Sequence, residues 1–258
     1  MSTDDESQKE LCRQKIIPLA DKENTMKAWL EAYSISVSGT PGADICRNKI
    51  VEFAEKENTM EAWAEVSRIT EEGSEQRKRA KLRAIALAEK ENTQEAWVFA
   101  SRIVEVMSEE RAYCEKKICE FAEQENTAKS WRHAYYTKIP TSTEQELCRA
   151  KIFELTQQEN TAEAWWVAYS VSEGGSKQEK ITRKNVVESA ETENTAEAWW
   201  YAYRAFSASS SKRKIFRAKI FEAAQKENTA ESWWYAYHSS LYGSEEYEVC
   251  KQKNILFS

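Results

Sequence analysis

The chain has 258 residues, of which 31% are charged and 41% hydrophobic, and its formal net charge at pH 7 is -6. No apolar run approaches the roughly 20 residues that a membrane-spanning helix requires, so the sequence predicts no transmembrane segment. The first residues are acidic and lack the basic and apolar stretches of a secretory signal. We therefore expect a disordered acidic N-terminus over 1–8 and an intracellular, cytoplasmic protein.

The sequence Glu-Asn-Thr occurs seven times at one constant interval, and a tryptophan follows four residues after each threonine. The glutamates are Glu23, Glu57, Glu91, Glu125, Glu159, Glu193 and Glu227. A fixed period of about 34 residues is typical of helix-turn-helix solenoids, in which each unit buries its apolar face against its neighbours. We predict an all-α, right-handed α-solenoid of about seven helix-turn-helix repeats and about 15 helices, forming a single domain over 9–258.

The chain is predicted to open with a helix from Glu10 to Lys22, in which Pro18 causes a kink or marks the true start. Each repeat then contributes two amphipathic helices, because its apolar residues follow helical spacing. The first helix runs, for example, from Ala196 to about Phe206, and the second from Lys214 to Lys226. The inner face of that second helix is predicted to carry Ile215, Phe216, Ile220, Ala223 and Ala224.

Loops and turns separate these helices. Variable stretches rich in serine and glycine are predicted to be loops, such as Val37 to Asp44, Ser172 to Gln178 and Ser207 to Ser211. The Glu-Asn-Thr triplet is predicted to form the tight turn into the next repeat, with Asn58 as N-cap and Glu61 completing a capping box. The repeat signature is Asn58, Thr59, Trp63, Asn194, Thr195 and Trp199. A ladder of ligand-binding triplets is the alternative interpretation.

Five of the six cysteines occupy one column of the repeat: Cys12, Cys46, Cys114, Cys148 and Cys250. The equivalent positions elsewhere are Ala80, Thr182 and Phe216, so the column is predicted to be buried. Stacked helices are about 8–10 Å apart, more than the roughly 7 Å that a disulfide allows between Cα atoms. We therefore expect free thiols in a reducing compartment. A metal ladder would need histidine or carboxylate companions at ligand spacing, and the sequence has none.

The sequence offers little for catalysis. It contains two histidines, His133 and His238, which fall in different columns of the repeat. It has no glycine-rich phosphate loop, metal-ligand spacing or pair of catalytic carboxylates. We expect a protein that is not an enzyme and that needs no cofactor or metal.

The segment Ala196-Glu197-Ala198-Trp199-Trp200-Tyr201-Ala202-Tyr203 resembles the first helix of a tetratricopeptide repeat. The second helix departs from that family, because Tyr203 replaces its glycine and Glu227 its usual proline. Segments such as Arg149 to Glu154 and Arg217 to Glu222 are similar to the half-a-tetratricopeptide variant, and a weaker likeness to protein prenyltransferase alpha subunits lacks the arginine after tryptophan. The resemblance implies a concave surface, lined by first helices, on which an extended peptide or partner helix docks.

All ten tryptophans fall in two adjacent columns of the first helix. The seven-fold column is predicted to fill the core. The second column, with the column four residues later, is predicted to line the groove with indoles and arginines, the residue types that dominate binding hot spots. The predicted partner-binding residues are Arg132, Trp166, Trp200, Trp234, Arg68, Arg102, Tyr136, Arg204 and His238. The alternative is that Trp166, Trp200 and Trp234 only pack against one another.

The predicted function is a non-catalytic scaffold or adaptor that binds a protein or peptide. One alternative is an RNA-associated scaffold, because second helices carry a basic column interrupted only by Glu115: Arg13, Arg47, Lys81, Arg149, Arg183, Arg217 and Lys251. A sequence pI of about 5.4 and acids in every second helix favour salt bridges there instead, so nucleic acid is not the expected partner. A second alternative is end-to-end self-assembly. The opening helix and the closing helix, Glu246 to Phe257, which places Asn254 in an apolar column, are predicted to cap the stack, and an incomplete cap would let copies associate end to end.

Overall fold

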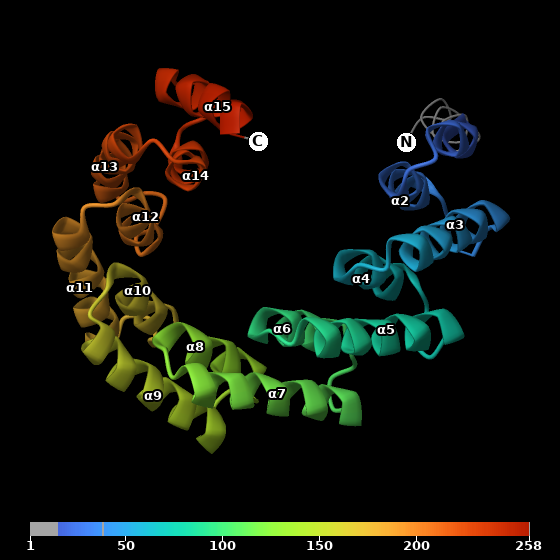
Figure 1. The fold of residues 1–258 in the computed structure, drawn as a ribbon, viewed down its shortest axis with the longest axis horizontal. Helices are drawn as coiled ribbons and strands as arrows, with labels where there is room; N and C mark the ends of the chain where they lie inside the picture. The colour runs from blue at the N-terminus through green and yellow to red at the C-terminus, as the bar shows by residue number, and fades with distance from the viewer. Residues whose placement is uncertain (1–14, 38, 258) are drawn as a thin grey trace, which may run out of the picture. The chain divides into compact units, whose positions relative to one another are not determined.

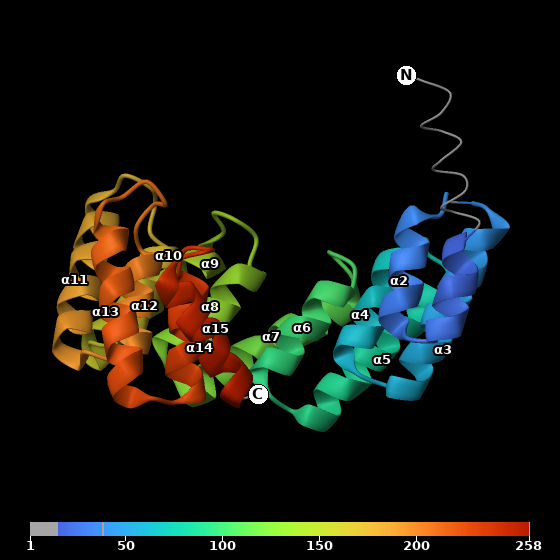
Figure 2. The ribbon, with the colours of Figure 1, turned by 90° about the horizontal axis from the view of Figure 1, so that it is seen from above.

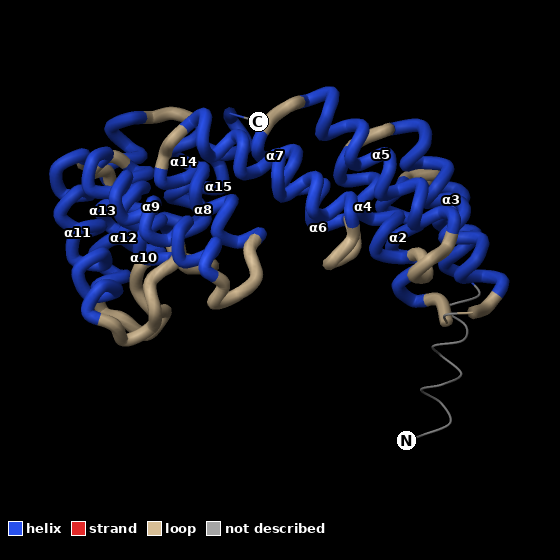
Figure 3. The backbone as a smooth tube through the Cα atoms, turned by 90° about the horizontal axis from the view of Figure 1, so that it is seen from below, coloured by secondary structure: helices blue, strands red, loops and turns tan. Residues whose placement is uncertain are grey.

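The computed structural model describes residues 15–37 and 39–257. Within these ranges the chain consists of helices and connecting loops, without a β-strand (Figure 3). The acidic segment 1–8, the start of the opening helix, Cys12 and Arg13 lie outside the described residues. Residues 15–23 are helical, and Pro18 lies inside this helical segment. No helix in the described part of the chain has the length and hydropathy needed to cross a membrane.

Short first helices alternate with longer second helices, as predicted. The first helices are α2 (Met26–Ile35), α4 (Met60–Ile69), α6 (Gln94–Ile103), α8 (Ala128–Thr137), α10 (Ala162–Ser170), α12 (Ala196–Arg204) and α14 (Ala230–Ser239). The second helices are α3 (Pro41–Glu57), α5 (Glu75–Glu91), α7 (Glu109–Glu125), α9 (Thr143–Glu159), α11 (Lys177–Glu193), α13 (Lys212–Glu227) and α15 (Glu245–Phe257). The first helices all begin at the same position of the repeat, directly after the triplet threonine, so the all-α helical-repeat prediction is confirmed.

The chain forms two compact units, one ending at Ile118 and the other beginning at Cys119, so that the boundary falls within α7. In the second unit, α8, α10, α12 and α14 contact one another in series, and each also packs on the second helices beside it (Figures 1 and 2). In the first unit, α4 contacts α6 in the same way, and α3 and α5 pack beside them. Each unit is therefore a layer of first helices backed by second helices. A single domain and a right-handed superhelix stay predictions.

The first tryptophan column lies in the core of both units. Six of its members are buried, namely Trp29, Trp63, Trp97, Trp165, Trp199 and Trp233, and Trp131 is half-buried. The cysteine column is also buried, as predicted: Cys46, Cys114, Cys148 and Cys250, with Ala80, Thr182 and Phe216 at the equivalent positions. The thiols of these four cysteines are free. Small or apolar side chains at this column let the second helix approach its neighbours closely.

The capping prediction for the triplet is wrong by one residue. Asn58 ends the preceding helix in the left-handed conformation, with φ 49° and ψ 46°. Thr59 has an extended backbone and is the N-cap, because its hydroxyl accepts a hydrogen bond from the Ala62 backbone N–H at 3.2 Å. Asparagine tolerates the left-handed region better than other residues with a Cβ, which explains its place at the C-cap. Glu61 therefore lies one residue too early to complete a capping box.

The remaining triplet groups bind other parts of the repeat. In four repeats the asparagine side chain accepts a hydrogen bond from the core indole of the same repeat, as in Trp165 Nε1 to Asn160 Oδ1 at 2.9 Å. In three repeats the glutamate accepts the first backbone N–H of the paired first helix, as in Ala128 to Glu159 at 2.7 Å. In these three repeats the triplet thus ends one helix, begins the next and binds the N-terminus of a third.

Helix boundaries differ slightly from the prediction. The first helix that begins at Ala196 ends at Arg204, before Phe206, and α13 begins at Lys212. Ile215 was predicted to face inward but is 59% exposed. Phe216, Ile220, Ala223 and Ala224 are buried at i, i+4, i+7 and i+8, and Ile215 lies about 100° away from Phe216 around the helix.

Candidate functional site

The predicted groove residues fall in two places. Arg68 on α4 and Arg102 on α6 belong to the first unit, and the other seven lie on first helices of the second unit. Within the second unit, residues four apart on one helix share a face, and consecutive first helices contact one another. This geometry brings together Arg132 and Tyr136 of α8, Trp166 of α10, Trp200 and Arg204 of α12, and Trp234 and His238 of α14.

Trp166 is buried, with 9% of its surface exposed, so the prediction that its indole lines an open groove is wrong. The guanidinium carbons of Arg132 and Arg204 each lie 4.6 Å from the centroid of its ring. Tyr201 packs on the same indole, with ring centroids 5.3 Å apart. Arg132 is half-buried and donates from Nε to the Ser170 hydroxyl at 3.1 Å, so α8, α10 and α12 close over the Trp166 ring.

Trp200 and Trp234 form an indole pair at the surface of α12 and α14. Their ring centroids are 5.8 Å apart in an edge-to-face arrangement, which is favourable for aromatic rings. Trp200 is half-buried and Trp234 is 44% exposed. His238 lies over Trp234 at 4.0 Å and Tyr203 stacks on Trp200 at 5.7 Å, so neighbouring rings hold both indoles in position.

A carboxylate row, Glu163, Glu197 and Glu231, runs beside the indole pair and was not predicted from the sequence. The Tyr201 hydroxyl lies 3.0 Å from Glu163 and 3.2 Å from Glu197, and the Tyr235 hydroxyl lies 3.0 Å from Glu197. Burial, followed by these carboxylates, raises the pKa of Tyr201 and of Tyr235 above its usual value, so both hydroxyls remain donors. The signal in the sequence was a tyrosine four residues after each of these last two glutamates.

In the first unit, Arg68 and Arg102 line one cavity of about 870 Å³. Arg68 pairs with Glu65 at 2.6 Å. Two more carboxylates, Glu72 and Glu105, line the same cavity together with apolar side chains. Positive and negative charges are therefore mixed in this cavity.

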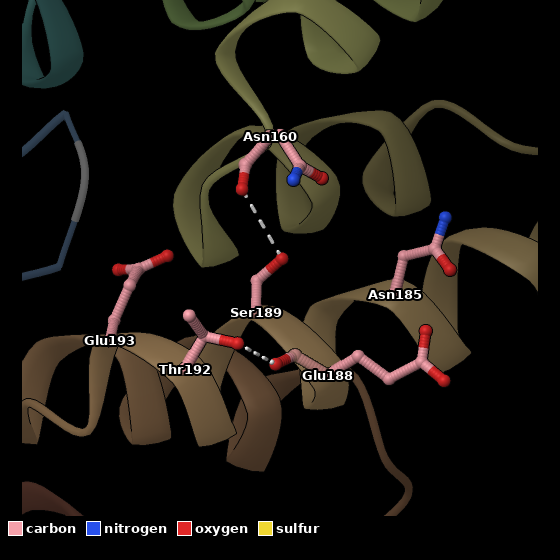
Figure 4. Close-up of a pocket in the computed structure, with 6 residues that line it drawn as sticks. All are labelled: Asn160, Asn185, Glu188, Ser189, Thr192 and Glu193. Carbon is pink, nitrogen blue, oxygen red and sulfur yellow. Dashed lines mark hydrogen bonds between the residues drawn. The ribbon is translucent and has the colours of Figure 1, made fainter.

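A ligand-binding triplet would place its site near Asn160, where a small cavity of about 240 Å³ lies between the α9–α10 turn and α11 (Figure 4). The polar groups at its wall already take part in the fold. The Asn160 carbonyl accepts from Ser189 at 3.4 Å, its side chain accepts from Trp165, and the Glu193 carboxylate accepts the Ala162 N–H at 2.6 Å. These bonds give the triplet a structural role.

The basic column of the second helices is largely paired with acids. Arg47 binds Asp44 at 2.9 Å, and Arg149 binds both Glu146 at 3.0 Å and Glu173 at 3.3 Å. Lys81 pairs with Glu105 and Arg183 with Glu179. The Arg149 side chain is only 19% exposed, so little of its charge faces solvent. In the described part of the chain, no three His, Cys, Asp or Glu side chains gather closely enough to hold a metal ion.

Comparisons with known proteins add little to this geometry. No protein-family model matches the chain, and no curated protein matches it. Among solved structures, it is similar to the DHF58 filament, with 16% identity over 95% of this chain and 94% of that one and a TM-score of 0.12. It is also similar to the de novo designed helical repeat protein DHR64, with 16% identity over 96% of both chains and a TM-score of 0.13. These TM-scores support no argument about function or assembly.

Proposed function

We propose that this protein is a non-catalytic interaction scaffold of the tetratricopeptide-like superfamily that binds a segment of a partner protein on α12 and α14. The observation that carries the proposal is the indole pair, which lies between the carboxylate row and the side chains of Arg204 and His238. Tryptophan beside arginine at the surface is the composition typical of binding hot spots. The free, buried thiols support a reducing, cytoplasmic location.

The arrangement also favours a particular partner segment. An aromatic or aliphatic side chain would be desolvated against Trp200 and Trp234, because Trp234 is 44% exposed and Trp200 is only half-buried. A basic side chain on one flank of the segment would meet Glu197 and Glu231, and an acidic one on the other flank would meet Arg204. Charge complementarity of this kind orients a bound segment more than it strengthens binding.

The test is selection of peptides from a displayed random library on the full chain, followed by calorimetric titration of the selected peptides. We expect the selected peptides to contain an aromatic or aliphatic anchor and to lose at least about tenfold in affinity for the Trp234→Ala variant. Tyr242→Ala removes another exposed ring, 89% accessible, in the loop after α14 and is the matched control. Peptides that bind both variants as tightly as the wild type would refute the proposal.

Self-association is a second candidate, because α15 keeps apolar side chains at its surface. Phe221 on α13 packs on Trp233 of the next first helix, with ring centroids 5.9 Å apart. Ile255 is the equivalent residue of α15 and is 67% exposed, beside Leu256 at 75%. A second copy covering these residues would make the apparent mass rise with concentration in light scattering, and a double Ile255→Ser, Leu256→Ser variant would abolish the rise. A constant mass would remove this candidate.

A further inference from the structure

A cavity of about 650 Å³ opens where α12 ends and α13 begins, within the second unit. Its wall carries three cationic side chains, Arg183, Arg204 and Lys212, and four residues with hydroxyl groups, Tyr169, Ser207, Ser210 and Ser211. The remaining lining residues include no carboxylate. Arg204 and Lys212 each lie over an aromatic ring, Trp166 at 4.6 Å and Phe206 at 5.1 Å, which holds both cations beside the cavity.

The repeat register shows how this positive charge arises. In two other repeats the loop supplies a glutamate that pairs with the second-helix cation, namely Glu105 with Lys81 and Glu173 with Arg149. The equivalent loop residue beside Arg183 is Ser207, so this repeat lacks that carboxylate. The cavity of the first unit that contains Arg102, the equivalent of Arg204 three repeats earlier, is lined by two glutamates. The two cavities therefore differ in charge, because the loops of the first unit supply glutamates and the loop after α12 supplies serines.

The neighbouring charges leave a net positive site. Arg183 is neutralised by Glu179 on its own helix, whose other oxygen accepts the Gly175 backbone N–H. Arg213 is held away, because its Nε donates to the Tyr203 carbonyl at 3.2 Å. In the part of the chain that the structure describes, Arg204 and Lys212 form no ion pair, and their contacts are with aromatic rings. Two cations are therefore available to a ligand.

We propose that this cavity binds the oxyanion of a phosphate monoester. Two unpaired cations match a dianionic phosphoryl group better than a single carboxylate, and the planar guanidinium of Arg204 can donate two parallel hydrogen bonds to it. The hydroxyl groups that line the cavity supply further donors for the remaining oxygens. The volume exceeds that of the phosphoryl group alone, so the residue that carries it can enter as well. The site stands on its own cations and does not require the indole pair to bind a partner.

The test is a phosphorus NMR titration of the full chain at low ionic strength with two probes, inorganic phosphate and N-acetyl-O-phosphoserine amide. Saturable line broadening with either probe is expected, and it should weaken as salt is added. Tighter binding of the phosphoserine derivative would identify a phosphorylated residue as the source of the oxyanion, and equal binding would identify a free phosphate. The absence of saturable broadening with both probes would overturn the proposal.

Matched variants locate the site. Lys212→Gln and Arg204→Gln should each weaken binding by about tenfold or more, since each removes a charged hydrogen-bond donor. Ser207→Glu should do the same by restoring the loop carboxylate beside Arg183. Arg102→Gln, in the equivalent cavity of the first unit, and Trp234→Ala, in the indole pair, should leave the titration unchanged. If Arg102→Gln weakened phosphate binding equally, the binding would be diffuse surface attraction and the proposal would be overturned. Trp234→Ala tests peptide binding by the indole pair, so failure of the scaffold proposal can be told apart from failure of the phosphate site.

Discussion

The Glu-Asn-Thr triplet shows what a repeated residue pattern reveals and what it leaves open. Its recurrence predicted a structural role correctly, but the cap was assigned to the wrong residue because asparagine and threonine are both good N-caps. The deciding quantity is the backbone angle of Asn194, φ 51°, which places it at the end of α11. Amino-acid type alone does not fix that angle. The hydrogen bond from the Trp199 indole to the Asn194 side chain, at 3.2 Å, was not predicted either, because it depends on the backbone conformation of Asn194 and on the orientation of the Trp199 ring.

Substitutions at this triplet separate the two roles of asparagine. Asn194→Gly keeps the left-handed C-cap but loses the indole bond, so we expect a loss of roughly 0.5–1.5 kcal/mol in unfolding free energy. Asn194→Ala loses both and should cost about 1–2 kcal/mol more, the usual penalty for a Cβ in that region. Urea denaturation measures both. If the alanine variant were as stable as the glycine variant, the left-handed cap would be wrong.

The buried cysteines give a second residue-scale prediction. Burial raises the pKa of the Cys114 thiol to about 11, and burial also raises the pKa of Cys46, Cys148 and Cys250. Only the thiolate reacts with maleimides, so these four should label slowly at pH 8 in the native state. Cys119 is only partly buried and should label before these four cysteines. Peptide mapping by mass spectrometry measures the order, and rapid labelling of Cys114 would contradict it.

The same pKa shift has a consequence for stability. Because the folded pKa of Cys114 lies above that of an unfolded thiol, its contribution is fully present below about pH 8.5. The contribution is lost as the pH rises toward 11, since the unfolded thiol ionises first. Cys114→Ala should therefore show a shallower fall in unfolding free energy than the wild type between pH 8.5 and about 10.5. Identical slopes in urea denaturation would contradict the burial of this thiol.

At the scale of the helix, the two tryptophan columns were predictable from their 100° separation, but the exposure of the second column was not. Trp166 is buried because Arg132 from α8 and Arg204 from α12 lie over its ring. Trp234 on α14 keeps 44% of its surface exposed. Exposure thus depends on side chains of neighbouring repeats, which differ from one repeat to the next. The carboxylate row likewise forms through contacts between neighbouring repeats, because Tyr201 binds Glu163 and Tyr235 binds Glu197.

The glutamate of the triplet links elements within a helix pair. Glu227 at the end of α13 accepts the Ala196 N–H at the start of α12 at 2.8 Å. Glu227→Ala should lower the unfolding free energy by about 1 kcal/mol, because it removes a charged acceptor at a helix N-terminus. Gln225→Ala, at an exposed position of the same helix, is the control and should change it by less than about 0.5 kcal/mol. Equal effects would mean that the link contributes nothing.

At the scale of the whole molecule, the fixed interval between triplets determined the fold class, since every repeat must then form the same packed unit. The chain carries 37 basic and 43 acidic residues, and its basic column is largely neutralised by nearby carboxylates. We expect no binding to generic single-stranded RNA at low ionic strength. Fluorescence anisotropy of a labelled RNA measures this, and a salt-sensitive rise in anisotropy would revive nucleic acid as a partner.

The most direct test of the account compares two adjacent residues of α14. Trp233 is 2% exposed and Trp234 is 44% exposed, so one belongs to the core and the other to the proposed binding surface. Urea denaturation of Trp233→Ala should show a loss of about 3–5 kcal/mol, as for other buried tryptophans. Trp234→Ala should lose less than about 1.5 kcal/mol, because 44% of this side chain is already exposed to water in the folded state. Equal losses for the two variants would contradict the assignment of a core column and a surface column.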